Sequence, residues 1–304
     1  MDYYQHDLAL VHARGFGTHA DRCAPGLLDL LAPVRGGLVV ELGCGAGALT
    51  RHLLTAGHRV IATDASAAML ELAWDALGGE ADLRQLTLPD DPVPAADAIV
   101  SVGHVVSYLP DAAAIDRALI AMTGALRPGG VLAIDICDLE FGRVRAGDAN
   151  RGLAGPDWAV ITEFSAPAPE VFVRDITTFV PDGTGAWRRG SERHENVLVD
   201  TSLIPALLGR YGVVATVGTA FGAAELPPGL RAVTGVQKLT GYQLAPASLV
   251  SSSWPGRWLA LPSLSAGPCT TTPSVAVVKP RSAQPDPPSS HVPAIRQLAP
   301  ASGE

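Results

Sequence analysis

The sequence is poor in cysteine, and its cysteines are not spaced as pairs. The four of them are scattered along 304 residues, and no C-x-x-C motif occurs. Disulfide frameworks and structural zinc sites depend on closely spaced cysteines. No group of histidines and acids has the spacing of a metal site either. We therefore expect reduced thiols, no bound metal and a cytoplasmic protein. The cysteines are Cys23, Cys44, Cys137 and Cys269.

The sequence also lacks an excess of basic residues and any long apolar run. Its 22 Lys and Arg are outnumbered by 30 Asp and Glu, so the formal net charge is −8. Nucleic-acid binding requires a basic surface, and a membrane span requires about 20 consecutive apolar residues. The segment from Met1 to Asp7 does not have the pattern of a signal peptide. These absences argue against nucleic-acid and membrane partners.

A short apolar segment followed by alternating glycines is the most informative stretch. Leu38, Val39 and Val40 predict a buried strand that ends at Glu41, and residues 43, 45 and 47 are all glycine before a predicted helix at 48–56. Glycines allow a tight turn and close approach of a ligand to the backbone. The helix N-terminus then offers free N–H groups to a negatively polarised ligand group.

A second acid follows at the spacing of a nucleotide-binding unit. Residues 58–64 predict another buried strand, which ends at Asp64. In a β-α-β unit an acid at this position faces the ribose hydroxyls, and a carboxylate can accept hydrogen bonds from both of them. The glycine turn and Asp64 together indicate a cofactor that contains a nucleoside.

Strands and helices alternate from residue 38 to residue 136, which predicts a doubly wound parallel sheet. Further strands are expected at 81–88, 95–102 and 131–136. Ligands of such sheets bind at the carboxyl ends of the strands. Five residues map to that edge and predict one site there: Glu41, Asp64, Gly103, His104 and Asp138.

The segments on either side of the sheet are less regular. We expect a helix that Pro25 opens and that runs to Pro33. After the fifth strand, three segments alternate like antiparallel strands, at 158–164, 171–180 and 187–199. A last helix at 203–208 and two final strands at 213–218 and 230–235 complete the pattern.

These motifs resemble those of the class I S-adenosylmethionine-dependent methyltransferases. The first motif of that family matches Glu41-Leu42-Gly43-Cys44-Gly45-Ala46-Gly47, and Asp64 ends the second strand. The loop after the fourth strand corresponds to Ser101-Val102-Gly103-His104, and the turn before the fifth to Leu126-Arg127-Pro128-Gly129-Gly130. The resemblance covers residues 1–238.

The resemblance implies an α/β fold: a Rossmann-like, doubly wound sheet, mostly parallel with an antiparallel last strand. It also implies that residues 1–36 form a lid over the cofactor, and that an antiparallel strand insert at about 155–200 covers the substrate pocket. Residues 239–304 are rich in proline and serine without a helical or strand period, so we expect a disordered tail there.

The resemblance also implies S-adenosyl-L-methionine as the cofactor and assigns residues to it. The expected cofactor-binding residues are Glu41, Gly43, Cys44, Gly45, Gly47, Asp64, Ala65, Met69, Thr87, Leu88, Gly103 and His104. The expected substrate-binding residues are Tyr3, Tyr4, Asp138, Trp187 and Arg189. The tyrosines have an alternative role as anchors of the N-terminus, and the insert residues have one as an exposed charged face.

The expected reaction is methyl transfer to a small-molecule nitrogen or oxygen acceptor by a monomer or homodimer. His104 is the candidate catalytic base, because histidine can accept a proton near neutral pH; its alternative role is packing against the cofactor. Two other functions stay open. Gly43 to Ala48 also satisfies the G-x-G-x-x-A pattern of NAD(P)-dependent oxidoreductases, and a cofactor-binding protein without catalysis is the third possibility.

Overall fold

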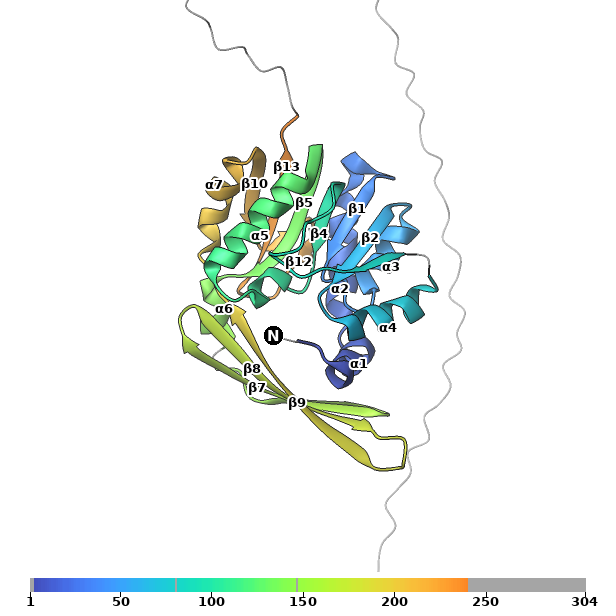
Figure 1. The fold of residues 1–304 in the computed structure, drawn as a ribbon. Helices are drawn as coiled ribbons and strands as arrows, with labels where there is room; N and C mark the ends of the chain where they lie inside the picture. The colour runs from blue at the N-terminus through green and yellow to red at the C-terminus, as the bar shows by residue number, and fades with distance from the viewer. Residues whose placement is uncertain (1–2, 80, 146, 240–304) are drawn as a thin grey trace, which may run out of the picture. The chain divides into compact units, whose positions relative to one another are not determined.

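The computed structural model describes residues 3–79, 81–145 and 147–239. This part of the chain has a seven-stranded central sheet and a separate four-stranded antiparallel sheet (Figure 1). The strand order of the central sheet is β10-β13-β5-β4-β1-β2-β3. The predicted tail begins at residue 239, and apart from Leu239 it lies outside the described residues.

The central strands are β1 (Leu38–Leu42), β2 (Arg59–Asp64), β3 (Asp82–Gln85), β4 (Ala96–Ser101), β5 (Leu126–Cys137), β10 (Val213–Gly218) and β13 (Leu230–Gln237). The second sheet contains β6 (Arg151–Gly155), β7 (Trp158–Ala168), β8 (Val171–Pro181) and β9 (Trp187–Val197). A short antiparallel pair, β11 (Ala220–Phe221) and β12 (Ala224–Glu225), lies between β10 and β13 in the chain.

The helices are α1 (His6–Gly15), α2 (Thr18–Leu30), α3 (Ala48–Thr55), α4 (Ala67–Leu77), α5 (Ala112–Ala125), α6 (Leu139–Arg145) and α7 (Ile204–Gly209). The described residues also form three short 3-10 helices: η1 (Ala32–Val34), η2 (Val105–Tyr108) and η3 (Thr201–Leu203).

The strand directions confirm the predicted sheet. β1 runs parallel to both β2 and β4, and β4 runs parallel to β5. β13 then enters antiparallel, between β5 and β10. The order reverses between β1 and β4, and ligands of doubly wound sheets bind outside the carboxyl ends at such a switch point.

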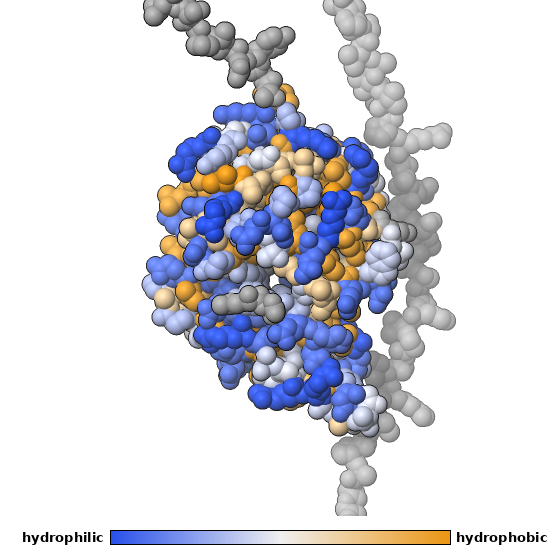
Figure 2. Space-filling view, in the orientation of Figure 1, coloured by the Kyte–Doolittle hydropathy of each residue, from blue (hydrophilic) through white to orange (hydrophobic). Residues whose placement is uncertain are grey.

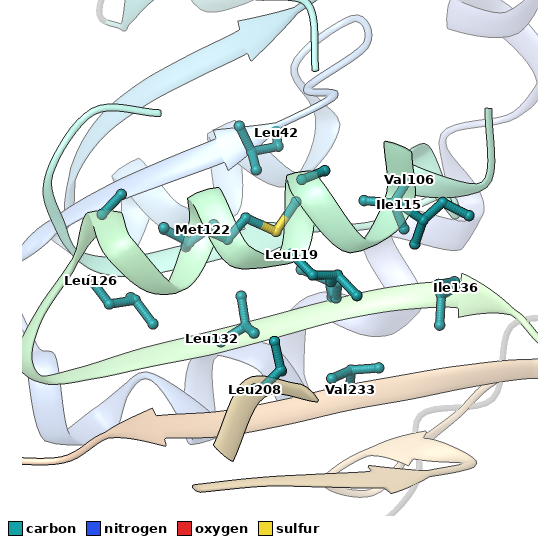
Figure 3. Close-up of a cluster of buried hydrophobic side chains, with 14 of the residues drawn as sticks. Leu42, Val106, Ile115, Leu119, Met122, Leu126, Leu132, Ile136, Leu208 and Val233 are labelled. Carbon is teal, nitrogen blue, oxygen red and sulfur yellow. The ribbon is translucent and has the colours of Figure 1, made fainter. Parts of the chain in front are cut away.

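Helices cover both faces of the central sheet. On one face, α5 and α7 bury Leu119, Met122 and Leu208 against Leu132 and Val233 of the strands (Figure 3). On the other face, α2 and α3 form a second cluster with the sheet. The strands are buried from both sides, which is why they have continuous apolar runs.

Three elements differ from the sequence-based expectation. Pro25 lies inside α2 rather than at its start. Proline in a helix interior costs about 3 kcal/mol, and the burial of Ala24 and Leu27 beside it offsets that cost. β5 begins at Leu126 instead of residue 131, because Pro128 and its two following glycines form a bulge within the strand. The insert has a fourth strand, β6, which its exposed residues did not reveal.

The insert sheet and α1 pack against each other. Leu8 and Val11 of α1 form a buried cluster with Trp158, Val160 and Ile176 of the insert. Figure 1 shows α1 between the central sheet and the insert, and the face of the insert seen in Figure 2 is mainly hydrophilic. The N-terminal segment is therefore held against the insert by an apolar contact of its own.

Candidate active site

The glycine turn after β1 has a backbone that only glycine accommodates well. Gly43 and Gly47 have φ angles of 75° and 83°, in the left-handed region that L-residues rarely adopt. A Cβ on Gly43 would lie 2.3 Å from Cγ2 of Val105. The turn is pinned by two backbone bonds of 2.8 Å, which Gly43 and Cys44 donate to the carbonyl of Thr63.

Glu41 lies beneath this turn and is buried, with 2% of its surface exposed. Thr50 on α3 donates a hydrogen bond of 2.6 Å to Oε2 of Glu41. Burial raises the pKa of Glu41 to about 7, against the lowering effect of the Thr50 hydrogen bond. Glu41 therefore joins the end of β1 to the first turns of α3 and holds the glycine turn between them.

Asp64 at the end of β2 faces the glycine turn. Its Oδ2 accepts from the Gly45 amide at 2.9 Å, and its Oδ1 accepts from the Ser66 amide at 2.9 Å. Burial raises its pKa, against these backbone hydrogen bonds. A carboxylate has about four lone-pair positions, and the amides of Gly45, Ser66 and Ala65 use three of them, so Asp64 can still accept a hydrogen bond from a ligand hydroxyl.

The other predicted cofactor residues lie around this edge. A Cβ on Gly45 would be 4.0 Å from Sδ of Met69, so the methionine lies next to the turn. Ala65 follows Asp64 directly, and its carbonyl accepts a hydrogen bond from Gln85. Thr87 donates its amide to Asp91, and Leu88 packs against the main core.

Cys44 is a packing residue in the described structure. It is buried, and burial raises the pKa of its thiol above the ordinary value. A nucleophilic cysteine requires a lowered pKa. This environment agrees with the view that Cys44 fills space within the turn.

The loop after β4 is held by a buried carboxylate, Asp135 of β5. Asp135 accepts from the amides of Gly103 and His104, at 3.1 and 2.6 Å. The φ angle of His104 is 50°, which is strained for a residue with a side chain. The two hydrogen bonds fix this strained loop at the edge of the sheet.

His19 of α2 is the third partner of Asp135, with Nε2 3.0 Å from Oδ2. Burial lowers the pKa of His19, but the bonds to Asp135 and Cys23 outweigh burial and raise it to about 10. His19 is therefore positively charged at neutral pH. Sequence reasoning missed it because 116 residues separate it from Asp135, and no motif marks it.

The ring of His104 lies among aromatic side chains. It stacks on Tyr108 with centroids 5.6 Å apart and is 6.0 Å from the ring of Phe141. Its Nδ1 is buried without a hydrogen-bond partner. Burial first, and then the charge of Arg174, lower the pKa of His104 to about 3. The ring is therefore neutral, and its predicted role as a base stays a prediction.

The two N-terminal tyrosines gather near His104. The hydroxyls of Tyr4 and Tyr108 are 3.0 Å apart, and the backbone of Tyr4 is bonded to Ser66 and Glu192. Tyr3 makes an edge contact with Tyr108, at 5.1 Å between centroids. These contacts fix the N-terminus and also bring Tyr4 to the site, so both roles considered for it are compatible.

A cavity of about 300 Å³ lies between this loop, α1, α2, α6 and the inner side of the insert. Its lining includes Gly103 and His104 together with aromatic and aliphatic side chains of the insert. The residues that line it are Tyr4, Leu8, His12, Phe16, His19, Arg22, Gly103, His104, Phe141, Arg145, Arg151, Leu153, Val160, Thr162, Phe164, Phe172, Arg174, Ile176, Pro227 and Leu230.

Four of the five predicted substrate residues do not line this cavity: Tyr3, Asp138, Trp187 and Arg189. Asp138 accepts hydrogen bonds from the hydroxyl and amide of Thr201, at 2.6 and 3.3 Å, and so fastens η3 to the end of β5. Trp187, which is 53% exposed, and Arg189 lie near the start of β9, paired with the far end of β8. Arg174 lines the cavity instead, in the first half of the long β8 strand.

Neither a candidate metal site nor a candidate membrane-spanning helix is found in the described part of the chain. Among residues 3–79, 81–145 and 147–239, no group of three or more His, Cys, Asp or Glu could hold a metal ion. Within the same ranges, no helix combines the length and the hydrophobicity needed to cross a membrane.

The comparisons with known proteins point to one family. A family described as a methyltransferase domain matches residues 39–130. An uncharacterised methyltransferase of Geobacillus kaustophilus is 35% identical over 109 residues, which are 34% of this chain and 48% of that protein. A ubiquinone biosynthesis O-methyltransferase of Methylocella silvestris is 29% identical over 192 residues, 61% of this chain and 62% of the relative. The chain thus aligns with about half the length of these curated relatives.

Solved structures show the same fold at low sequence identity. An S-adenosylmethionine-dependent methyltransferase from Clostridium acetobutylicum has a TM-score of 0.64 at 16% identity, over 76% of this chain and 97% of its own. The sugar N-methyltransferase KedS8 from Streptoalloteichus has a TM-score of 0.63 at 22% identity, over 78% and 96%. Residues 39–130 thus match a methyltransferase domain, and the described part of the chain has the fold of solved S-adenosylmethionine-dependent methyltransferases.

Proposed function

We propose that this chain transfers a methyl group from S-adenosylmethionine to a nitrogen or oxygen of a small molecule held in the cavity. The observation that carries the proposal is that the glycine turn, Asp64 and the cavity meet at one edge of the sheet. Gly103 and His104 belong both to that edge and to the cavity lining. A ligand at the turn and a second one in the cavity would therefore be neighbours.

The residues at the edge fit the proposed cofactor. The Gly45 position has no side chain, and a Cβ there would meet nothing closer than 4.0 Å, so a ligand can approach the backbone. Asp64 retains acceptor capacity for a ribose hydroxyl beside its three backbone hydrogen bonds. When bound, the cofactor supplies a methyl group that is activated by a positively charged sulfur. The protein's own part is to hold the acceptor in line with it.

His104 is positioned to orient the acceptor. Its unpartnered Nδ1 is a buried polar atom, and such an atom costs about 1–3 kcal/mol until it is paired. In the tautomer that leaves Nδ1 unprotonated, it accepts a hydrogen bond from an acceptor N–H or O–H. That contact aims the lone pair of the acceptor atom, whose proton leaves as the new bond forms. For an amine acceptor that proton passes to water, and for a hydroxyl acceptor it passes to Nδ1 of His104, to which it is hydrogen-bonded.

The size and enclosure of the cavity favour a small acceptor. About 300 Å³ is at the lower end of the range for ligand pockets, and the insert and α1 close it on one side. The solved sugar N-methyltransferase named above shares this fold, and the relative from Methylocella silvestris is named an O-methyltransferase. Both observations agree with a nitrogen or oxygen acceptor.

Calorimetric titration tests the cofactor first. The full chain is titrated with S-adenosylmethionine, S-adenosylhomocysteine and NAD, and so are Asp64→Ala and the exposed control Asp75→Ala. We expect the first two ligands to bind and the Asp64 variant to bind roughly tenfold or more weakly, because hydrogen bonds to a charged group are lost. Binding of NAD alone would replace the proposal with the oxidoreductase alternative.

An acceptor screen by mass spectrometry tests the reaction. We expect a small amine or alcohol to gain one methyl group when the full chain and S-adenosylmethionine are present. Cofactor binding without turnover of any acceptor would favour the cofactor-binding protein without catalysis. RNA or protein as the main methylated product would contradict the small-molecule acceptor.

A further inference from the structure

A half-buried arginine on the insert has no acidic partner among the described residues. Arg174 of β8 lines the cavity, and its neighbours across the sheet are Phe164 and His194. Its Nη2 donates to the hydroxyl of Tyr108 and to Oδ1 of Asn196, the latter at 3.2 Å. These partners are neutral. Its Nε is buried and has no hydrogen-bond partner.

A buried charge without a counter-ion is costly. Removing a guanidinium from water costs several kcal/mol, and neutral partners recover only part of it. The guanidinium of Arg174 also lies 5.5 Å from the ring centroid of Tyr108, and a cation–π contact contributes about 0.5–2 kcal/mol. A bound anion would neutralise the charge of Arg174. It could also accept the hydrogen bond that the Nε–H does not make to the protein.

The rest of the cavity lining has the same sign of charge. Arg22, Arg145 and Arg151 also line it, and none of its lining residues is Asp or Glu. In the described ranges 3–79, 81–145 and 147–239, Arg145 is paired with Asp148, but no carboxylate forms an ion pair with Arg22, Arg151 or Arg174. A positive cavity in a chain of net charge −8 is a local feature that composition does not explain.

Nearby histidines do not account for this charge pattern. Burial, and after it the charge of Arg174, lower the pKa of His12 to about 4 and that of His104 to about 3. Both rings are therefore neutral. His19 is charged, but Asp135 neutralises it. Arg174 is thus a charged residue close to His104 in the cavity wall, and it has no acidic partner in the described ranges.

We propose that the methyl acceptor carries a carboxylate or phosphate group and that Arg174 binds this group inside the cavity. The inference rests on the proposed function, since it concerns the acceptor of that same site. Arginine suits the role because its planar guanidinium matches both oxyanions with several donors. The apolar side of the cavity, with Phe164, Phe172 and Ile176, would hold an apolar body attached to the anion.

Calorimetric titration with three probes tests this site. Phenyl phosphate and benzoate represent the two oxyanions, and benzamide is the neutral counterpart. The full chain, Arg174→Gln and the control Arg193→Gln are compared, with and without S-adenosylhomocysteine. Arg193 is on the same insert, but it is exposed and paired with Asp175 and Glu195, so its loss changes the net charge equally without changing the cavity.

We expect at least one of the two anions to bind the wild type and Arg193→Gln alike, and to bind Arg174→Gln roughly tenfold or more weakly. Benzamide should not distinguish the variants. The stronger of the two anions then identifies the acceptor group as phosphate or carboxylate. Equal anion binding by wild type and Arg174→Gln, or no anion binding at all, would overturn the inference.

Two further measurements keep the result interpretable. Circular dichroism and thermal unfolding establish that Arg174→Gln folds, and Arg174→Lys replaces it if it does not. Lysine keeps the charge but loses the planar fork, so we still expect weaker anion binding, and unchanged binding would count against the inference. Anion binding in a chain that fails to bind S-adenosylhomocysteine would support the anion site and reject the proposed methyl transfer.

Discussion

His19 and Asp135 form a partly buried ion pair, with Nε2 of the histidine 3.0 Å from Oδ2 of the carboxylate. The pair connects α2 to β5 and so joins the N-terminal segment to the centre of the sheet. Asp135 also accepts the amides of Gly103 and His104. One carboxylate thus holds both the N-terminal segment and the loop that separates the cofactor edge from the cavity.

The first prediction concerns Asp135→Asn. The amide keeps one acceptor oxygen, but it removes the negative charge that keeps His19 protonated against the effect of burial, and it turns an NH₂ group toward backbone donors. Loss of one partner of a buried pair costs about 3–5 kcal/mol, and we expect that loss in the free energy of unfolding by urea. The control is Asp116→Asn on the exposed side of α5. Equal stabilities of the two variants would contradict the role given to Asp135.

The second prediction concerns the pH dependence that His19 contributes. Its folded pKa of about 10 lies above the value of about 6.5 expected for an unfolded chain. The folded state therefore binds more protons in between, so stability from this pair is complete below about pH 6.5 and is lost as pH rises toward 10. The slope cannot exceed about 1.4 kcal/mol per pH unit.

The measurement compares wild type with His19→Gln by urea unfolding from pH 6 to pH 10. Groups common to both proteins cancel in the difference. We expect the stability advantage of the wild type to shrink steadily across this range. A difference that stays constant with pH would show that the charge of His19 does not contribute to folding.

The third prediction compares Gly43→Ala with Gly57→Ala. Both glycines have positive φ angles, 75° and 86°, so each alanine pays about 1–2 kcal/mol of backbone strain. At Gly57 a Cβ meets nothing within 4 Å, whereas at Gly43 it would lie 2.3 Å from Val105. We expect Gly43→Ala to be less stable by a further ~1–3 kcal/mol and to bind S-adenosylhomocysteine more weakly. Equal losses would contradict the packing argument.

Much of the cofactor edge could be predicted from local sequence. Continuous apolar runs predicted β1, β2, β4 and the second half of β5, and alternating glycines predicted the turn after β1. Glu41 and Asp64 are predictable because an acid at the carboxyl end of a parallel strand lies at the edge of the sheet where ligands bind. These inferences depend on contacts between residues that are close in the chain or one β-α-β unit apart.

The cavity could not be predicted in the same way. Two of its charged residues, His19 and Arg174, lie 155 positions apart on elements that meet only after the insert folds back over α1. Neither has a motif. Trp187 and Arg189 are candidates from sequence because they lie on the insert. However, β8 and β9 are each eleven residues long, and only the part of the insert near α6 and α1 reaches the cavity. Strand length, rather than composition, decided which residues line it.

The last prediction concerns His104→Asn. Asparagine tolerates a positive φ angle better than most residues, so the strained loop and its bonds to Asp135 should persist. The variant loses the imidazole, and with it the contact proposed to aim the acceptor. We expect kcat for the acceptor found in the screen to fall by roughly 10²-fold, while the affinity for S-adenosylhomocysteine measured by calorimetry changes little.

His52→Asn is the matched control, because His52 is a histidine on the exposed side of α3. It should retain the kcat of the wild type. If His104 only packs against the cofactor, the result reverses: the affinity for S-adenosylhomocysteine falls, and kcat at saturating cofactor is preserved. The pH profile separates the roles again. A base with a pKa of about 3 is unprotonated throughout the neutral range, so loss of an orienting contact should lower kcat equally from pH 6 to pH 8.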